Sequence, residues 1–453
     1  MQSFDLVIVG TGSGNAIPES LSDRRIALVE RDVFGGTCLN RGCIPSKMFI
    51  YAADQAMHVR EASRYGLSAE LTGVDWAGIV DRVFGRIDPI AAGGREYRIE
   101  GSPNVTVFEG SGRFIDHKVL DVDGETIAGD QFVLAAGARP FVPDIPGLVE
   151  TGFHTSDSIM RDRVLPERLL IIGGGYIACE LGHVFDAFGT AVTMFVRSDR
   201  LLRAEDDAVS ERFTELSRER FDVRSGAAID SVSRDGDEVV LRYHDETGGH
   251  EVRGDQLLVA TGRVPNGDQL DVTATGVEVD HAGRVRVDDH LRTTVEGIWA
   301  FGDLSNRFQL KHVANAEARV VFHNVEHPDD LRTMDYGAVP HAVFSNPQVA
   351  SVGMTERDAA SEGVPFVTAT QDYGGTAYGW AMEDTTSFAK VIAHASTRQI
   401  LGAHIIGPQA ATLIQPLIQA MQFDRTVEEV ARGQMWIHPA LTEVVENALL
   451  ALD

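Results

Sequence analysis

The sequence predicts an α/β protein with two Rossmann-like dinucleotide-binding domains, followed by a smaller C-terminal α+β domain. Two apolar segments, "FDLVIV" at residues 4–9 and "LLII" at residues 169–172, each run directly into a glycine-rich turn. A buried strand followed by such a turn is typical of a dinucleotide-binding domain, because glycine lets the backbone approach a pyrophosphate closely. The length of 453 residues agrees with about three domains of ~150 residues each.

The first glycine turn contains Gly10, Gly12 and Gly14, and the strand "RIALVE" ends in Glu30 about twenty residues later. In this pattern the glycines receive the pyrophosphate and the acid binds a ribose hydroxyl. Asn15 stands where the third fingerprint glycine is expected. We therefore expect phosphate binding at this turn, although the missing glycine argues against close packing of a following helix. A purely structural glycine turn is the alternative.

The second glycine turn lies in "LLIIGGGYIACELG" and places Gly173, Gly175 and Ala178 on the same template. The next predicted strand, "AVTMFV", is followed by Arg197, and Arg203 stands six residues later. An acid at this place favours NAD, whereas arginines accommodate the 2′-phosphate of NADP. The pattern indicates NADPH, with a solvated basic loop as the alternative.

Three further strand ends indicate that the second domain interrupts the first. "GIWAFGDLS" places Asp303 directly after a strand, while "VLAAGARP" and "LLVATGRVPN" place Gly137 and Gly262 after two others. Two nucleotide turns combined with these returning segments imply two similar domains. The expected boundaries are residues 1–146 and 264–335 for the first domain, 147–263 for the second, and 336–453 for the C-terminal domain.

Composition excludes several classes of partner. A net charge of −27 argues against nucleic acid and anionic membranes, and no apolar run of ~18 residues predicts a transmembrane helix. We expect no signal peptide, because residues 4–14 already read as a buried strand and its glycine turn. The three cysteines point to a reducing, cytoplasmic compartment.

Two of these cysteines, Cys38 and Cys43, lie five residues apart in "GGTCLNRGCIPSKMF". A regular helix rises ~1.5 Å per residue and would hold them more than ~7 Å apart, whereas a disulfide needs Cα atoms within about 7 Å. If the two pair, the chain between them must be tightly wound or irregular, and the glycines of this stretch supply that freedom. Pro45 suits the first turn of a helix that continues after the pair.

Zinc binding and a structural disulfide are the competing interpretations of the cysteine pair. Structural zinc takes four ligands, usually as two close pairs, and no Cys or His nearby in sequence completes a set. A structural disulfide does not suit a reducing compartment. We therefore interpret Cys38 and Cys43 as a catalytic redox pair and expect no metal. Cys179, in the second domain, fits a small buried residue instead.

Taken in chain order, these motifs resemble the FAD-dependent pyridine-nucleotide disulfide oxidoreductases, a family that includes glutathione reductase and dihydrolipoamide dehydrogenase. The resemblance covers nearly the whole chain and rests on "GTGSG", "GGTCLNRGCIPSK", "GGGYIACE", "ATGRVPN", "AFGD", "VFSNPQVASVGMTE" and "HPALTE". It implies FAD in the first domain, NADPH in the second, and a homodimer formed through the C-terminal domain with active sites shared between chains. The implied reaction is NADPH-dependent reduction of a low-molecular-weight disulfide.

The resemblance also implies catalytic roles. Cys43 is the sulfur nearer the flavin, and Cys38 attacks the substrate disulfide as a thiolate. A departing thiolate is expelled better when it is protonated, so an acid–base group is expected. "HPALTE" supplies His438 for this role, with Glu443 to hold the imidazole. Pro439 is expected at the first position of the helix that comes next.

Further roles are implied by the same resemblance. Lys47 is expected to point toward the flavin and to pair with Glu180, and Tyr176 to cover the nicotinamide pocket until NADPH enters. An ordinary surface or interface contact is the alternative for all three. Additional cofactor contacts are assigned to Gly36, Thr37, Gly137, Gly262 and Asp303.

The sequence also bears on rival functions. Dihydrolipoamide dehydrogenase would want an acid where Arg197 stands, and mercuric reductase would want a further cysteine pair near the C-terminus. A glutathione reductase would carry a substrate-contacting arginine at the place of Ser20. A flavin electron-transfer or signalling protein would have no use for the cysteine pair together with "HPALTE". The loop at residues 378–384 is a candidate substrate contact, or equally a loop at the dimer surface.

Overall fold

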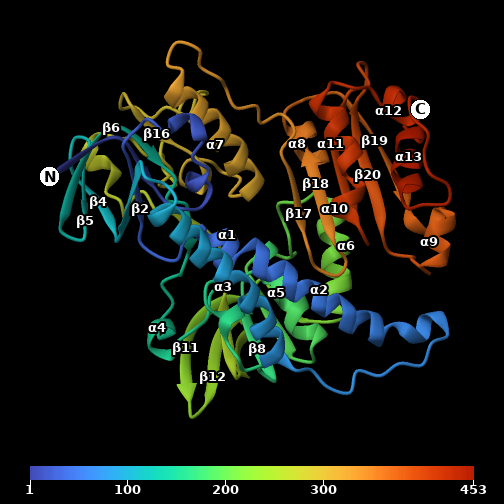
Figure 1. Cartoon of the computed structure of the whole chain (residues 1–453). Helices are drawn as coiled ribbons and strands as arrows, with labels where there is room; N and C mark the ends of the chain where they lie inside the picture. Colours follow the sequence, from blue (N-terminus) through green and yellow to red (C-terminus); the bar gives the residue numbers. More distant parts are fainter. Residues whose placement is uncertain (453) are drawn as a thin grey trace.

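The structure is a computed structural model that describes residues 1–452. Figure 1 shows three sheet-containing regions: one built from the N-terminal strands and a later segment, one from the middle of the chain, and one from the C-terminal part. The predicted α/β class is confirmed. No helix within residues 1–452 is long and apolar enough to cross a membrane.

The first sheet has a parallel core in the order β3-β2-β1-β6, and β16 adds to β6 in parallel. β1 and β2 are apolar runs buried on both faces, as expected for central strands between covering layers. β4 and β5 extend β6 as an antiparallel meander. The strands are β1 Gln2–Val9, β2 Ile26–Glu30, β3 Val105–Glu109, β4 Gly112–Asp116, β5 Val119–Val122, β6 Glu125–Leu134 and β16 Ile298–Ala300.

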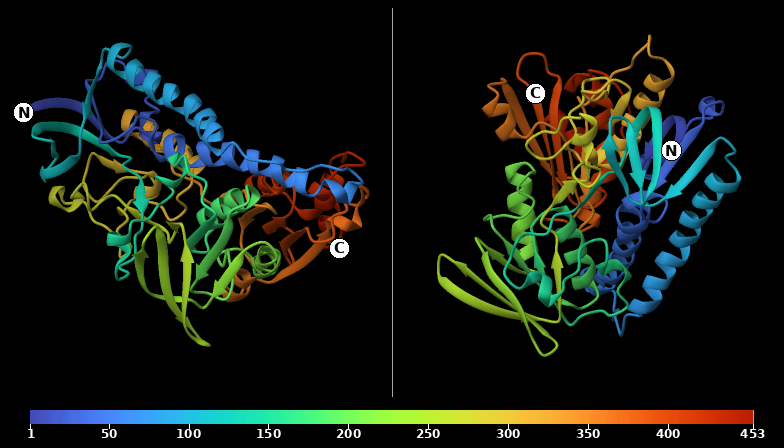
Figure 2. Two further views of the ribbon diagram at one scale, coloured as in Figure 1. Left: turned by 90° about the horizontal axis from the view of Figure 1, so that it is seen from below. Right: turned by 90° about the vertical axis from the view of Figure 1, so that its left-hand side faces the viewer.

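The helical segments of this region differ in length. The longest, α2 and α3, lie together along one side of the molecule (Figure 2), and Phe49 of α2 packs on Trp76 of α3. The α-helices are α1 Gly36–Arg41, α2 Cys43–Arg60, α3 Trp76–Glu100 and α7 Lys311–Glu326. The 3₁₀ segments are η1 Ser13–Asn15, η2 Glu19–Leu21, η3 Ala62–Tyr65, η5 Val272–Thr275 and η6 Gly302–Leu304.

The second sheet repeats the same parallel order, β10-β9-β8-β14. Its strands are β8 Arg168–Ile172, β9 Ala191–Val196, β10 Asp222–Ser225 and β14 Gln256–Val259, and its helices are α5 Tyr176–Ala187 and α6 Asp207–Arg218. A separate meander comprises β11 Ala228–Asp235, β12 Glu238–Asp245 and β13 Gly248–Gly254. The linking segments include α4 Leu148–Thr151 and η4 Ile159–Arg161.

The chain passes between the two nucleotide-type regions along two paired strands. β7 Ala138–Pro140 carries it out of the first region, and β15 Arg263–Pro265 brings it back, antiparallel to β7. This pairing places both crossings side by side, which is how one domain sits within another. The residue-level domain boundaries stay a prediction.

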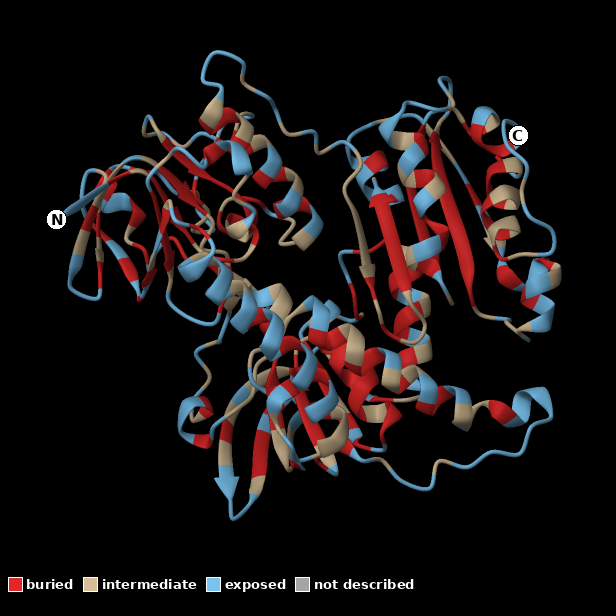
Figure 3. Ribbon diagram, viewed as in Figure 1, coloured by how far each residue is buried: buried red, intermediate tan, exposed pale blue. Residues whose placement is uncertain are grey.

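The C-terminal region is an antiparallel sheet in the order β17-β18-β21-β20-β19. Its strands are β17 Pro340–Val343, β18 Val349–Gly353, β19 Phe366–Asp372, β20 Phe388–His394 and β21 Ile400–Ile406. Its helical elements are α8 Glu356–Ser361, η7 Tyr373–Gly375, α9 Ala377–Ala381, α10 Ala410–Leu413, α11 Gln415–Gln422, α12 Val427–Arg432 and α13 Thr442–Leu450. Side chains from α10 to α13 and from the sheet form one buried cluster, visible as red ribbon in Figure 3.

Candidate active site

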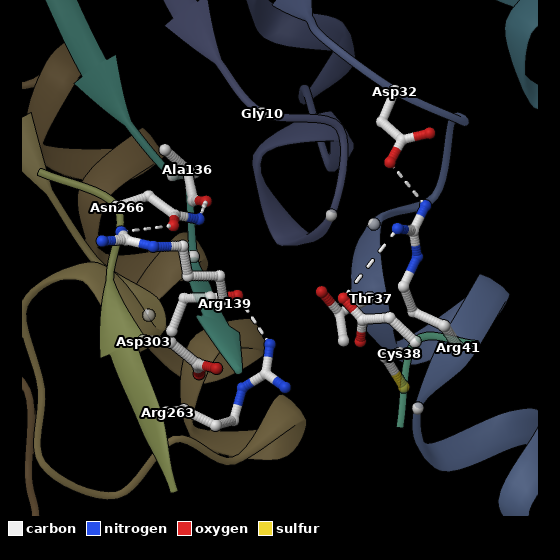
Figure 4. A pocket seen from close by; sticks show the side chains of 18 of the residues that line it. Gly10, Asp32, Thr37, Cys38, Arg41, Ala136, Arg139, Arg263, Asn266 and Asp303 are labelled. Carbon is white, nitrogen blue, oxygen red and sulfur yellow. Dashed lines mark hydrogen bonds and ion pairs between the residues drawn. The ribbon is translucent and has the colours of Figure 1, made fainter. Parts of the chain in front are cut away.

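A cavity of about 500 Å³ lies where the carboxyl ends of the first sheet meet the redox helices and α5. In open α/β sheets, ligands bind at this edge of the sheet. Figure 4 shows Thr37 and Cys38 on one side of the cavity and Arg263 and Asp303 on the other, with the turn at Gly10 between them. The site is therefore built from segments far apart in the sequence.

The two cysteines lie at a break between two helices. α1 ends at Arg41, Gly42 takes up a non-helical conformation, and α2 begins at Cys43. A Cβ at Gly42 would lie 2.9 Å from the Thr37 oxygen and 3.2 Å from the Cys38 Cα, so only glycine lets the two cysteines approach so closely. The prediction that the linking chain cannot be a regular helix is confirmed, as is Pro45 in the first turn of α2.

The two thiols are free and share a hydrogen bond. This bond, with the nearby Lys47 ammonium, lowers the pKa of Cys43 to about 7. The same bond and burial raise the pKa of Cys38. Cys43 therefore loses its proton first, and Cys38 needs a base from elsewhere to become the thiolate.

The predicted pairing of Lys47 with Glu180 is present. Lys47 Nζ lies 2.8 Å and 2.7 Å from the two Glu180 oxygens, and Glu180 also accepts the Phe344 N–H at 2.9 Å. These residues come from α2, from α5 and from the segment after β17. One buried carboxylate thus joins the three regions next to Cys43.

Tyr176 is the first residue of α5 and lines the cavity. The residue is partly exposed at the cavity, and desolvation of its hydroxyl raises the pKa to about 12, so the group remains neutral at physiological pH as an ordinary tyrosine does. Its position at the cavity is compatible with a movable cover over a ring-shaped ligand, and that role stays a prediction.

At the first glycine turn, close approach of backbones leaves no room for side chains. A Cβ on Gly10 would lie 2.4 Å from the Ala135 oxygen, and one on Gly36 would lie 2.7 Å from the Gly12 Cα. Glu30 accepts hydrogen bonds from the Thr11 backbone N–H at 2.9 Å and from its hydroxyl at 2.6 Å. The cavity therefore offers a tight backbone cradle with a carboxylate beside it, which fits a dinucleotide.

No α-helix continues directly from the first turn. The chain makes the three-residue η1 and then turns away before Pro18. Gly14 packs against the strand instead, where a Cβ would lie 2.9 Å from Ala135 Cβ. The Asn15 carbonyl, which a helix would satisfy internally, accepts from Arg98 Nη2 at 2.7 Å. The missing third glycine put close helix packing in doubt, and the structure has only the short η1 at this position.

Asp303 comes after β16 and lines the cavity. Burial raises the pKa of its carboxyl, while Arg263 and Lys311 counteract that rise. The Gly302 N–H donates to Glu317 at 2.7 Å, which holds the turn that presents Asp303. Gly137 and Gly262 lie in the turns on either side of the β7–β15 crossing; Gly137 lines the cavity directly, and Gly262 precedes Arg263, which does.

Sequence reasoning missed five cations that line the cavity, and three of them stand beside the proposed cofactor turns. Arg139 and Arg263 stand on the paired strands β7 and β15, and Lys311 is the first residue of α7. Arg139 pairs with Asp268, and Arg263 donates to the Ala138 oxygen at 2.6 Å. A signal existed for the two arginines, because each stands one or two residues after a glycine already singled out. For Lys311 the only signal in the sequence is that lysine is rare in this chain, which contains four lysines.

The second glycine turn, unlike the first, leads directly into a long helix. A Cβ on Gly173 would lie 2.3 Å from the Ala260 oxygen, whereas one on Gly175 would meet nothing within 4 Å. The twelve-residue helix α5 begins at once, and its N-terminal N–H groups face this open space. The arrangement is a ready pyrophosphate site of the helix-terminus kind.

The arginines after β9 are available to a ligand. Arg197 and Arg203 are exposed, and neither has an ion pair or hydrogen bond within residues 1–452. Arg200, between them, is already paired with Asp207 and Glu211. The loop is tied to the glycine turn, because the Leu202 N–H donates to the Gly174 oxygen at 2.8 Å.

His438 and Glu443 form the predicted pair in the C-terminal region. His438 Nδ1 lies 2.7 Å from Glu443 Oε1, and this contact lowers the pKa of Glu443. The expectation that Pro439 opens the helix is wrong: α13 begins at Thr442, and Pro439 lies in a bend before it, after a cis bond. Glu443 Oε2 accepts the Ala440 N–H at 3.2 Å, which holds this bend against the helix start.

The structure does not bring His438 together with the cysteines. Its side chain is 73% exposed and is absent from the cavity lining among residues 1–452. Cys38 and Cys43 lie on α1 and α2, whereas His438 precedes α13 at the far side of Figure 1. Within one chain, the dithiol therefore lacks its expected acid–base partner.

A dithiol set between two nucleotide-type glycine turns defines a two-cofactor disulfide oxidoreductase. Residues 4–318 match the pyridine nucleotide-disulphide oxidoreductase family, and residues 339–449 match the dimerisation domain of the same name. The chain belongs to this family. It is an FAD-dependent disulfide reductase that uses a pyridine nucleotide.

Three known proteins illustrate the similarity. The chain is 48% identical to mycothione reductase from Mycobacterium tuberculosis, and the alignment covers 100% of both proteins. It is 33% identical to mercuric reductase from Staphylococcus aureus, over 94% of this chain and 78% of that protein. Among solved structures, HOCl-induced flavoprotein disulfide reductase RclA from Escherichia coli matches with a TM-score of 0.87 and 27% identity, covering 100% of both chains.

Proposed function

We propose that the protein reduces mycothione, the disulfide of mycothiol, with NADPH as the electron donor. The observation that carries this proposal is the 48% identity to a mycothione reductase over the full length of both proteins. Mercuric reductase is a weaker match, and Cys179 is the last cysteine of this chain, so a C-terminal cysteine pair is lacking. An uncharged Ser20, where glutathione reductase carries an arginine, suits a neutral sugar–inositol thiol.

The placement of the cofactors is part of the proposal. FAD bound at the first turn supplies two-electron chemistry between NADPH and the cysteine pair. The contacts that support this placement are the Gly12–Gly36 cradle, the Glu30 carboxylate and Asp303. NADPH is assigned to the open space at Gly175, with Arg197 and Arg203 for its 2′-phosphate.

The cysteines then transfer two electrons to the substrate. The Cys38 thiolate attacks one sulfur of the substrate disulfide, forms a mixed disulfide and releases the first thiol. The Cys43 thiolate attacks the Cys38 sulfur, breaks the mixed disulfide, releases the second thiol and closes the Cys38–Cys43 bridge. Each released thiolate takes up one proton, and the low pKa of Cys43 makes it an effective attacking thiolate near neutral pH.

We further propose that the acid–base group comes from a second copy of the chain. Two observations support this: His438 is poised by Glu443 but lies away from its own cysteines, and its neighbours Met435 and Ile437 are 99% and 73% exposed. Large apolar side chains gathered at an exposed surface are typical of an interface. By contrast, the apolar residues of α11 and α13 are largely used within the chain's own core.

Parallel assays test the substrate. NADPH oxidation is measured with mycothiol disulfide, glutathione disulfide and lipoamide under identical conditions. The expected result is that kcat/KM for mycothiol disulfide exceeds the other two by at least tenfold. Equal or higher efficiency with glutathione disulfide or lipoamide would contradict the assignment.

Subunit complementation tests the shared site. A Cys38→Ser chain is mixed with a His438→Ala chain, each inactive alone, and subunits are allowed to exchange. One site of each heterodimer then contains both defects and the other contains neither, so part of the wild-type activity should return. A fully active monomer, or no recovery after proven exchange, would place the acid–base group within one chain.

A further inference from the structure

The first glycine turn lacks the positive electrostatic end that an adjoining α-helix provides. At the second turn, α5 points its N-terminus at the open space beside Gly175. The partial positive charge of a helix N-terminus is about half an elementary charge, and it favours phosphate. The first turn leads only into η1, a single 3₁₀ turn of three residues. A pyrophosphate bound there needs another source of positive charge.

Lys311 places an ammonium group on this turn. Its Nζ lies 2.8 Å from Ser13 Oγ, and that hydroxyl in turn donates to Asn315 Oδ1 at 2.8 Å. Lys311 and Asn315 are four residues apart on α7, so they share one face of that helix. Ser13 is itself part of the glycine turn, and both Ser13 and Lys311 line the cavity. The ammonium is therefore held at the loop that the fingerprint assigns to phosphate.

The position of Lys311 is costly in the protein alone. It is the first residue of the sixteen-residue helix α7, where the helix dipole disfavours a cation. It forms no ion pair with any acid among residues 1–452, unlike Lys47 and Lys390, and the nearby Asp303 carboxylate attracts it only at longer range. An anion bound between Ser13 and the start of α7 would satisfy both the side chain and the helix end.

We propose that Lys311 binds the pyrophosphate of FAD and supplies, from α7, the charge that a helix N-terminus supplies at the second site. This inference rests on the placement of FAD at the first turn given under the proposed function. Arg98 completes the arrangement from the other side, because it satisfies the Asn15 carbonyl that the missing helix leaves free. Lys311 is thus the cofactor-binding cation and Arg98 the residue that holds the loop.

Flavin binding to the full-length protein tests the assignment. Flavin is removed, and the dissociation constants of FAD and riboflavin are measured by quenching of flavin fluorescence. Lys311→Met should weaken FAD binding by ~10–100-fold, the range for a lost charge-assisted hydrogen bond. Riboflavin, which has no phosphate, should bind the variant and the wild type within about twofold. Lys311→Arg keeps the charge and should recover most of the FAD affinity.

Lys118→Met is the matched control, because Lys118 contacts the Asp130 carbonyl and lies outside the cavity. It should leave FAD binding unchanged. Unchanged FAD affinity in Lys311→Met would overturn the proposal. An equal loss of FAD and riboflavin would also overturn it, because Lys311 would then act at the ring or through the fold.

A Gly12→Val variant tests whether FAD binds at the first glycine turn, independently of whether Lys311 contacts its pyrophosphate. A Cβ at Gly12 would meet only the Gly36 Cα at 3.9 Å, so the first side-chain atom enters the cradle without an internal clash and the branched valine extends it into the space assigned to the phosphates. If Gly12→Val loses FAD and Lys311→Met does not, only the role of Lys311 fails. If both variants bind FAD normally, the placement of FAD at the first turn fails with it.

Discussion

The two nucleotide turns share a strand order and a glycine spacing but differ in what surrounds the phosphate site. After β8 the chain runs straight into α5, and the space beside Gly175 is open. After β1 it makes a short 3₁₀ turn that Lys311 and Arg98 hold from two other helices. The same sheet topology thus carries two kinds of glycine turn. One is followed directly by its own helix, and the other is held by side chains from distant segments.

The second strand of each region differs as well. β2 ends in Glu30, which is already bound to Thr11 of its own turn. β9 is followed by Arg197 and Arg203, which have no partner in residues 1–452. A fixed acid fits a ribose with free hydroxyls, whereas free guanidinium groups fit a ribose that carries a phosphate. If the cofactors bind as proposed, the side chains after the second strand, rather than the glycines, distinguish the two sites.

The largest expected effect on activity comes from replacing the cysteines, which lie where the two nucleotide-type regions meet. Cys38→Ser and Cys43→Ser should each lower NADPH-dependent disulfide reduction by roughly 10³-fold or more, because loss of a nucleophile removes covalent catalysis. Both variants should retain FAD, since neither sulfur belongs to a phosphate turn. With the flavin oxidised and no reductant added, Cys38→Ser should show the long-wavelength thiolate-to-flavin band, because Cys43 is then a free thiolate, whereas Cys43→Ser should lack it. Substantial turnover by either variant would sink the redox-pair assignment.

Removing both free arginines tests the cofactor difference. Arg197→Gln combined with Arg203→Gln should raise KM for NADPH by roughly 10-fold or more per contact, because each charge-assisted phosphate bond contributes about 1.5–3 kcal/mol. KM for NADH should change little. Arg200→Gln is the control in the same loop, since Arg200 is already paired with Glu211. Equal effects on both coenzymes would show that the two arginines are merely solvated.

Alanine at one glycine of each turn probes the two architectures. At Gly14 the new Cβ would lie 2.9 Å from Ala135 Cβ and 3.3 Å from Ile8 Cγ2, so overpacking should destabilise the fold by about 1–3 kcal/mol. Gly175→Ala meets open space and should leave stability within about 0.5 kcal/mol while weakening NADPH binding. Thermal unfolding and NADPH titration check both. A larger loss of stability in Gly175→Ala than in Gly14→Ala would contradict the expected difference between the two turns.

The smallest effect concerns the junction of the two regions. Lys47 lowers the pKa of Cys43, so Lys47→Gln should raise it, by roughly one unit. In the wild type the Cys43 thiolate forms as pH rises through about 7, and in the variant it should form only at higher pH. The pH dependence of the long-wavelength band in the reduced protein measures this midpoint, with Lys118→Gln as control. An unmoved or lowered midpoint would contradict the electrostatic role.

Much of the fold could be read from local patterns. The strands at β1 and β8, both glycine turns and the break between the cysteines each depend on a few neighbouring residues. The pairing of Lys47 with Glu180 could be predicted only because both residues stand in motifs that resemble a known family. The start of α13 was misjudged, because a proline that suits a first helical position lies in a bend that Glu443 holds.

Local spacing and residue type predicted the two nucleotide turns and the redox pairing of the cysteines, because each of these features depends on one short segment of the chain. The contacts between charged and polar side chains from distant segments could be seen only in the tertiary structure. Lys311 reaches Ser13, and Arg98 reaches Asn15, across long stretches of chain. The interaction of two charges depends on their distance in space, and that distance is set by how sheets and helices pack rather than by any local pattern. For the same reason the structure of one chain shows His438 apart from Cys38, although the family resemblance implies that the two act together across a dimer interface.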